Sequence, residues 1–301
     1  MRILLICVIS SCFLAGCSNT PPKPLTANST PAPQEPAVKK TLKIGLALGG
    51  GAARGFAHVG VIAVLEEAGL KPQLVVGTSA GSLVAALYAS GQTSAQLKQT
   101  ALSLQEVAIT DWMLPIFGRG MFRGDALARY VNELVSSRLI DAMPMPLGIV
   151  ATDLITGGAV LFQKGDTGTA VRASSAVPAV FVPVKINGRE YVDGGLVSPV
   201  PVRFARQMGA DVVVAVDISN PPEANANAAS DTLQILLQTF AIMGKSINQY
   251  ELAGSDVVVV RPSLVGLKSA DFSARQLAID RGRAAMLAAL PALKAKLASM
   301  R

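Results

Sequence analysis

A serine between two glycines is the residue in this chain best placed to act as a nucleophile. Gly77, Ser79 and Gly81 form a Gly-x-Ser-x-Gly pentapeptide, whose glycines permit a tight turn around the serine. Residues 73–78 are an apolar, valine-containing run that predicts a buried strand, and residues 80–90 are rich in alanine and leucine, which predicts a helix. Ser79 is therefore expected at a strand-to-helix turn, where the helix N-terminus stabilises negative charge. A serine that only caps the helix is the alternative.

A glycine-rich segment after the apolar run 41–48 could bind an oxyanion. It reads Gly-Gly-Gly-Ala-Ala-Arg-Gly over residues 49–55 and leads into a helical pattern over 56–69. A dinucleotide site has a similar plan, but here the spacing is Gly-x-Gly-x-x-x-Gly and the next strand does not end in a ribose-binding acid. Free amides of such a loop can instead hold the oxyanion of a tetrahedral intermediate. Arg54 adds positive charge to the loop, or pairs with a carboxylate as an ordinary loop residue.

Three aspartates follow strand-like runs and could supply the base: Asp153, Asp193 and Asp217. Strand ends are where α/β enzymes assemble their sites, so the pattern alone does not choose among them. Two glycines directly after Asp193 leave its carboxylate unobstructed and favour it. For Asp153 and Asp217 we expect turn or cap roles.

The chain has one histidine, His58, so either this residue is the base of a Ser-His-Asp triad or Ser79 is activated without histidine. His58 lies three residues after Gly55, inside a helical pattern. In such a place a structural histidine is the commoner outcome.

In their order and spacing these motifs resemble the patatin-like phospholipases, specifically the bacterial, single-domain branch. The similarity runs from about Lys43 to Asp217, with softer matches at 151–157 and 172–183. The resemblance implies a lipid acyl hydrolase, or phospholipase A-type esterase, that forms an acyl-serine intermediate. It implies a Ser-Asp dyad in which Ser79 is the nucleophile and Asp193 the base, and it leaves histidine out of the chemistry.

The resemblance also implies an oxyanion hole built from the glycine loop. The candidates are Gly50, Gly51, Ala52 and Arg54. The chain departs from the family at Ala52, where members with the shorter loop have glycine, so the order of the amides stays open.

Residues 41–301 are expected to form one patatin-like phospholipase domain, a three-layer α/β/α fold with a mainly parallel central sheet. A helix over 231–254 carries an apolar stripe that we expect to be buried in the core. Two helices, over 271–281 and 282–299, are predicted to finish the chain. The apolar segment 109–122 is either a mobile flap at the site or, as we expect, packed against the sheet.

Residues 1–16 have the charged start and short apolar run of a signal peptide. The run closes with Leu-Ala-Gly before Cys17, which resembles the lipobox of bacterial lipoproteins and implies cleavage and lipidation at Cys17. A noncleaved anchor helix is the alternative. Residues 17–40, rich in proline, predict a flexible tether. We therefore expect a lipid-anchored protein of the bacterial cell envelope, and Ser18 favours the outer membrane where one exists.

The net charge of +7 suits contact with anionic lipid. The expected partners are a lipid or other carboxylic ester and, through the lipid anchor, a membrane surface. No nucleic-acid motif is visible, and the absence of a His/Cys cluster or calcium-loop spacing predicts no metal or cofactor. A lipoprotein of this fold with a structural or regulatory role and weak or no catalysis remains the alternative.

Overall fold

Five parallel strands form the centre of the sheet in a computed structural model of the chain. Across the sheet the order is β10-β9-β1-β2-β4-β8-β7, with β5 paired to β4. The parallel strands are β1 (Ile44–Leu48), β2 (Leu74–Thr78), β4 (Leu147–Asp153), β9 (Val212–Val216) and β10 (Val257–Val260). The antiparallel ones are β5 (Ala159–Phe162), β7 (Val184–Ile186) and β8 (Arg189–Asp193).

The structure describes residues 42–106, 109, 111, 120–219, 221–222, 231–267 and 271–300. All of them belong to one compact unit, Lys40–Arg301. A separate two-stranded sheet pairs β3 (Gly120–Phe122) with β6 (Ala179–Phe181).

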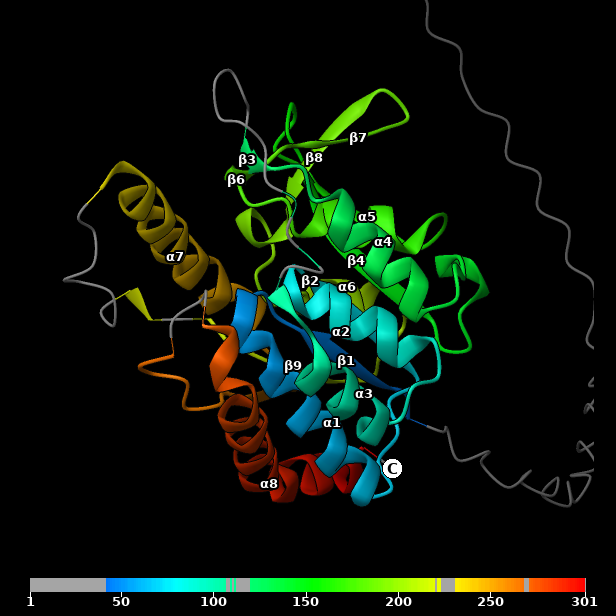
Figure 1. The fold of residues 1–301 in the computed structure, drawn as a ribbon. Helices are drawn as coiled ribbons and strands as arrows, with labels where there is room; N and C mark the ends of the chain where they lie inside the picture. The colour runs from blue at the N-terminus through cyan, green and yellow to red at the C-terminus, as the bar shows by residue number, and fades with distance from the viewer. Residues whose placement is uncertain are drawn as a thin grey trace, which may run out of the picture. The chain divides into compact units, whose positions relative to one another are not determined.

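The alternation of side chains along the strands divides the core between two faces of the sheet. On β1, Ile44, Leu46 and Leu48 belong to the larger cluster, whereas Ala47 faces the smaller one. The larger cluster is covered by α1 (Ala57–Glu67), α2 (Ala80–Ala89), α3 (Ser94–Ser103), α4 (Asp125–Leu134), α5 (Thr167–Ser174) and α8 (Arg275–Ser299), as Figure 1 shows for α1, α3 and α8. The smaller is covered by α6 (Val202–Gln207). The α/β class with a mainly parallel sheet between helices is confirmed.

The chain ends in one long helix, α8, so the prediction of two helices was wrong. Gly282, at the predicted boundary, lies inside this helix and serves close packing. A Cβ atom on Gly282 would overlap the Ala57 carbonyl of α1, and one on Gly60 would overlap the Ile279 carbonyl of α8. The two glycines thus let the helices approach within backbone contact.

The apolar stripe of α7 (Thr232–Glu251) is not buried in the core, contrary to our expectation. Its only buried residues within the described chain are Gly244, Asn248 and Glu251, while Ile242 and Met243 are about half exposed. Figure 1 shows the helix leaving the body of the sheet. The buried residues of α7 therefore lie towards its C-terminal end, while Gln238, nearer its start, donates a hydrogen bond to the Pro222 carbonyl at 2.8 Å.

Most of the apolar segment 109–122 lies outside the described residues, so its expected packing against the sheet and the alternative of a mobile flap both stay predictions. At its start, Asp111 accepts hydrogen bonds from the N–H groups of Gly124 (2.6 Å) and Ala126 (3.0 Å) at the beginning of α4. Across the described part of the chain, no helix has both the length and the apolarity needed to span a bilayer.

Candidate active site

Ser79 lies at the turn between β2 and α2 in a strained backbone conformation. Its φ is +54° and its ψ −126°, values that a residue with a side chain rarely adopts. Gly77 and Gly81 make the turn possible, because a Cβ on Gly77 would overlap the Gly81 carbonyl and one on Gly81 the Leu48 carbonyl. The tight turn leaves Ser79 partly exposed at the N-terminus of α2. This is the geometry of a nucleophile elbow.

Asp193 ends β8 and is buried, with 6% of its surface exposed. Its carboxylate accepts hydrogen bonds from the Ser79 side chain and from the Gly195 N–H, the latter at 2.7 Å. Burial raises the pKa of Asp193 to about 6, although both hydrogen bonds act to lower it. A carboxylate with that pKa, in contact with a serine hydroxyl, is a stronger base than an exposed aspartate.

The other two aspartates serve turns, as expected. Asp153 accepts hydrogen bonds from the N–H groups of Ile155 (3.0 Å) and Thr156 (2.9 Å), and these bonds lower its pKa. Asp217 accepts from Ser219 Oγ at 2.6 Å and pairs with Arg261. Of the three candidates, Asp193 is the one that contacts Ser79.

The glycine loop passes beside Ser79, but its amides are not equivalent. A Cβ on Gly50 would lie 3.1 Å from the Ser79 Cβ, so the loop approaches the serine closely. The Gly50 N–H donates to the Pro199 carbonyl at 3.0 Å and is therefore occupied. Within the described chain the amides of Gly51 and Ala52 donate no hydrogen bond. The Arg54 N–H is occupied as well, because it donates to the Gly51 carbonyl at 3.2 Å. Of the four candidate residues, Gly51 and Ala52 therefore have amides available for an oxyanion.

Arg54, within the glycine loop, and His58, in α1, are buried and make hydrogen bonds to backbone carbonyls that hold the loop in place. Arg54 is buried, and its Nε donates to the Ile218 carbonyl at 3.0 Å; burial lowers its pKa to about 10 against the opposing effect of Asp217. His58 is fully buried, with its Nε2 2.9 Å from the Gly49 carbonyl oxygen, and burial lowers its pKa to about 4. A neutral imidazole donates this hydrogen bond through Nε2. The histidine thus holds the first residue of the glycine loop.

Two buried polar groups near the site were missed by the sequence analysis. Ser174, at the end of α5, accepts the Ser79 N–H through its Oγ at 2.9 Å. Glu251, at the end of α7, accepts from Ser198 Oγ at 2.9 Å, and the Ser198 carbonyl accepts the Thr78 hydroxyl at 2.9 Å. Ser174 lies within the softer family match, so a signal existed, but burial of a serine cannot be read from its type.

The turn after the central strand β2 thus carries a serine elbow that lies against a buried carboxylate and is flanked by a glycine loop, within a mainly parallel α/β domain. The patatin-like phospholipase family model matches residues 46–206, which is more than half of the chain. The chain belongs to the patatin-like phospholipase family.

Bacterial and animal proteins are similar to this chain over part of its length. An uncharacterized NTE family protein of Mycobacterium tuberculosis (strain H37Rv) is 35% identical over 188 residues, which cover 62% of this chain and 52% of the relative. Human patatin-like phospholipase domain-containing protein 6 is 33% identical over 197 residues, 63% of this chain and 14% of that protein. The crystal structure of VipD from Legionella pneumophila has the same fold, with a TM-score of 0.55 and 15% identity over 83% of this chain and 67% of VipD. The chain spans about half the length of the mycobacterial relatives it matches.

Proposed function

We propose that the protein is a serine acyl hydrolase that cleaves lipid esters through a Ser79–Asp193 dyad. One observation carries the proposal: the Ser79 side chain, at a strained elbow, donates a hydrogen bond to a buried carboxylate whose pKa is raised to about 6. Membership of the patatin-like phospholipase family supports a lipid as the substrate.

In the first half of the reaction Ser79 Oγ attacks the ester carbonyl carbon while Asp193 takes its proton. The carbonyl oxygen gains negative charge, and the amides of Gly51 and Ala52 are the donors proposed to bind it. The positive end of α2 stabilises the same charge. When the tetrahedral intermediate collapses, protonated Asp193 gives its proton to the leaving alkoxide, and the acyl group stays on Ser79.

In the second half, Asp193 removes a proton from water as the water oxygen attacks the acyl carbon. Collapse of the second intermediate breaks the bond to Ser79 Oγ, which recovers the proton from Asp193. The products are a carboxylic acid and the free enzyme. The raised pKa of Asp193 serves both halves, because the same group must accept a proton and return it near neutral pH.

The test is hydrolysis of a medium-chain p-nitrophenyl ester and of phospholipid vesicles by the full chain and four variants. We expect Ser79→Ala and Asp193→Asn to lower kcat/KM by about 1,000-fold or more. Asp153→Asn, the matched control at another strand end, should keep activity within a few-fold of native. His58→Gln should stay well above the Ser79→Ala background. A folded His58→Gln variant as inactive as Ser79→Ala would instead revive the triad.

Full inactivity of the native chain towards both substrates would contradict the proposal. It would favour the alternative function, a lipoprotein with a structural or regulatory role.

For location we propose a lipid anchor at Cys17 in the bacterial cell envelope, based on the Leu-Ala-Gly-Cys sequence that ends at this residue. Cells that express the chain and are fed an alkyne-labelled fatty acid should yield a labelled protein that begins at Cys17. The Cys17→Ser variant should carry no label. A labelled Cys17→Ser variant, or an uncleaved native chain, would contradict the anchor.

A further inference from the structure

The C-terminal turn of α5 holds the backbone of both dyad residues. Ser174 Oγ accepts a hydrogen bond from the Ser79 N–H at 2.9 Å. Two residues later, the Ala176 carbonyl accepts the Asp193 N–H at 3.0 Å. Nucleophile and base, distant in the sequence, are thus both tied to residues 174–176.

The Ser174 hydroxyl is oriented by a second hydrogen bond. It is fully buried, and it donates its one proton to the Val150 carbonyl of β4 at 2.5 Å. A serine hydroxyl has a single proton, so the bond to Val150 turns an oxygen lone pair towards Ser79. On the same strand, Thr152 Oγ1 donates to the Asp193 carbonyl at 2.7 Å. β4 therefore supports both dyad residues: it orients Ser174, which accepts the Ser79 N–H, and it binds the Asp193 carbonyl directly.

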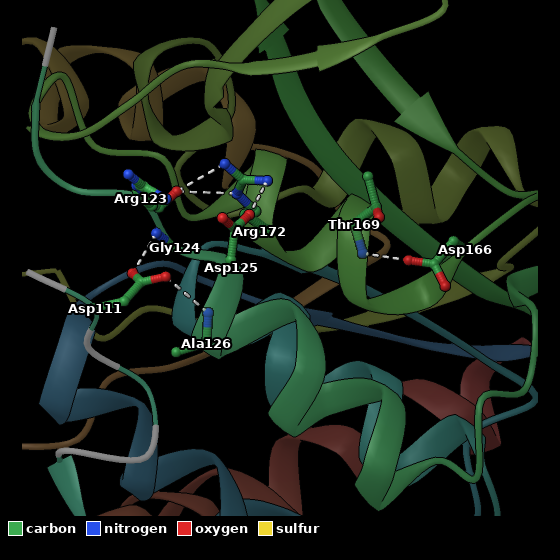
Figure 2. Close-up of polar contacts among 8 residues, drawn as sticks. All are labelled: Asp111, Arg123, Gly124, Asp125, Ala126, Asp166, Thr169 and Arg172. Atoms are coloured by element: carbon green, nitrogen blue, oxygen red, sulfur yellow. Dashed lines mark hydrogen bonds and ion pairs between the residues drawn. The ribbon is translucent and has the colours of Figure 1, made fainter. Parts of the chain in front are cut away.

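The helix that carries Ser174 is clamped along its length (Figure 2). At its start, Asp166 caps the helix by accepting the Thr169 N–H at 2.7 Å. Near its end, Arg172 forms an ion pair of 2.6 Å with Asp125 and donates twice to the Arg123 carbonyl, at 3.1 and 2.8 Å. These bonds hold α5 against α4, so Ser174 rests on a support that resists displacement.

The elbow needs such a support because its conformation is unfavourable by itself. If the hydrogen bond from the Ser79 N–H to Ser174 Oγ is lost, Ser79 can relax from φ +54° towards a more favourable backbone conformation. The Ser79 N–H also loses its buried acceptor. Release would move Ser79 Oγ relative to Asp193, and misplacement of about 1 Å can cost a hundredfold in rate.

We propose that Ser174 is a positioning residue. Its hydroxyl holds the Ser79 backbone in place, so that the Ser79 hydroxyl stays within reach of the Asp193 carboxylate. The kinetic part of this inference rests on the proposed function, whereas the hydrogen bond itself does not.

The kinetic test compares Ser174→Ala with Thr167→Val in the full chain. Thr167 is the matched control: it is fully buried on the same helix, and its hydroxyl donates to the Arg138 carbonyl at 2.6 Å, away from Ser79. We expect Ser174→Ala to lower kcat for the p-nitrophenyl ester by about 10- to 100-fold with KM changed less than about twofold. Thr167→Val should keep the native kcat. Ser174→Thr, which retains a hydroxyl, should recover most of the loss.

The pH dependence gives a readout that a merely structural role would not move. The Ser79 hydrogen bond lowers the pKa of Asp193, so weakening that bond should move the acid limb of the kcat/KM profile to higher pH in Ser174→Ala. Native kcat and an unmoved acid limb in a folded Ser174→Ala variant would overturn the proposal while leaving the dyad intact.

Hydrogen exchange of the Ser79 amide tests the proposal without catalysis. In the native chain this amide should be protected, and Ser174→Ala should speed its exchange by about tenfold or more while Thr167→Val leaves it unchanged. Equal Ser79 exchange in native and Ser174→Ala proteins would overturn the proposal whether or not the chain is active. Failure of the proposed function alone would appear as inactivity of the native chain with the exchange result intact.

Discussion

Replacing Asp193 by asparagine should stabilise the folded protein at neutral pH while abolishing hydrolysis. Burial raises the pKa of Asp193 to about 6 from 3.8. Between these two values the unfolded chain releases the proton while the folded chain retains it. Stability therefore falls as pH rises through this window, because the carboxylate must ionise in a buried place.

The magnitude follows from the size of the pKa shift. A shift from 3.8 to about 6 corresponds to about 3 kcal/mol at pH 8, of which only about 0.5 kcal/mol is present at pH 4. Asparagine has a similar shape and no charge, so the variant avoids the cost of ionising a buried carboxylate. The gain of Asp193→Asn over the native chain should be about 2.5 kcal/mol larger at pH 8 than at pH 4.

His58 makes the comparison with the variant necessary. Burial lowers the pKa of His58 to about 4 from 6.5, so protonation of the unfolded chain weakens the fold as pH falls from 6.5 to 4. This slope, also worth about 3 kcal/mol, opposes that of Asp193 and partly hides it in the native chain. The difference between native and Asp193→Asn cancels the His58 contribution.

The assay is urea unfolding of both proteins at pH 4 and pH 8. Asp153→Asn is the control without this slope: hydrogen bonds lower the pKa of Asp153 from 3.8, so its stabilising effect is lost only below about pH 4, and its replacement should destabilise the protein by nearly the same amount at pH 4 and pH 8. If the free energies of unfolding of the native protein and of Asp193→Asn differ by the same amount at both pH values, burial does not raise the pKa of Asp193 and the reasoning is refuted.

Three further predictions address the base and the loop backbone. With Asp193 as base, kcat/KM should fall about tenfold from pH 7 to pH 5, a profile that a base with pKa near 4 would not give. Ala52→Gly should raise the free energy of unfolding by about 1 kcal/mol, because Ala52 has φ +50°; an unchanged urea midpoint would count against strain there. Two helical glycines should respond oppositely in the same assay. Gly81→Ala should lower stability by about 3 kcal/mol or more, since its Cβ meets backbone, whereas Gly244→Ala, with 3.5 Å of room, should raise it by about 0.5–1 kcal/mol.

The strands, the elbow and the glycine loop could be predicted because each is a local pattern. The apolar run 74–78 and the glycines around Ser79 determine their own conformation within a few residues. The choice among the aspartates could not be derived in this way. In the sheet Asp193 lies opposite Ala151 of β4, because β8 runs antiparallel to β4. The direction of a strand depends on its tertiary neighbours, so the local sequence does not reveal it.

The error at α7 has a related physical cause. Periodicity shows that a helix has an apolar side but not what lies against that side. The occupied Gly50 amide was equally invisible, because its partner, the Pro199 carbonyl, comes from a distant loop.

The buried His58 gives this protein a natural spectroscopic probe. The chain holds one imidazole, so its ring signals in an NMR spectrum need no assignment. With a pKa of about 4 the ring stays neutral across the physiological range, and Nε2 reports on the Gly49 carbonyl at the start of the glycine loop. A molecule that enters the loop and shifts its backbone would therefore change a single, already identified resonance, and binding could be followed without any label on the protein or the ligand.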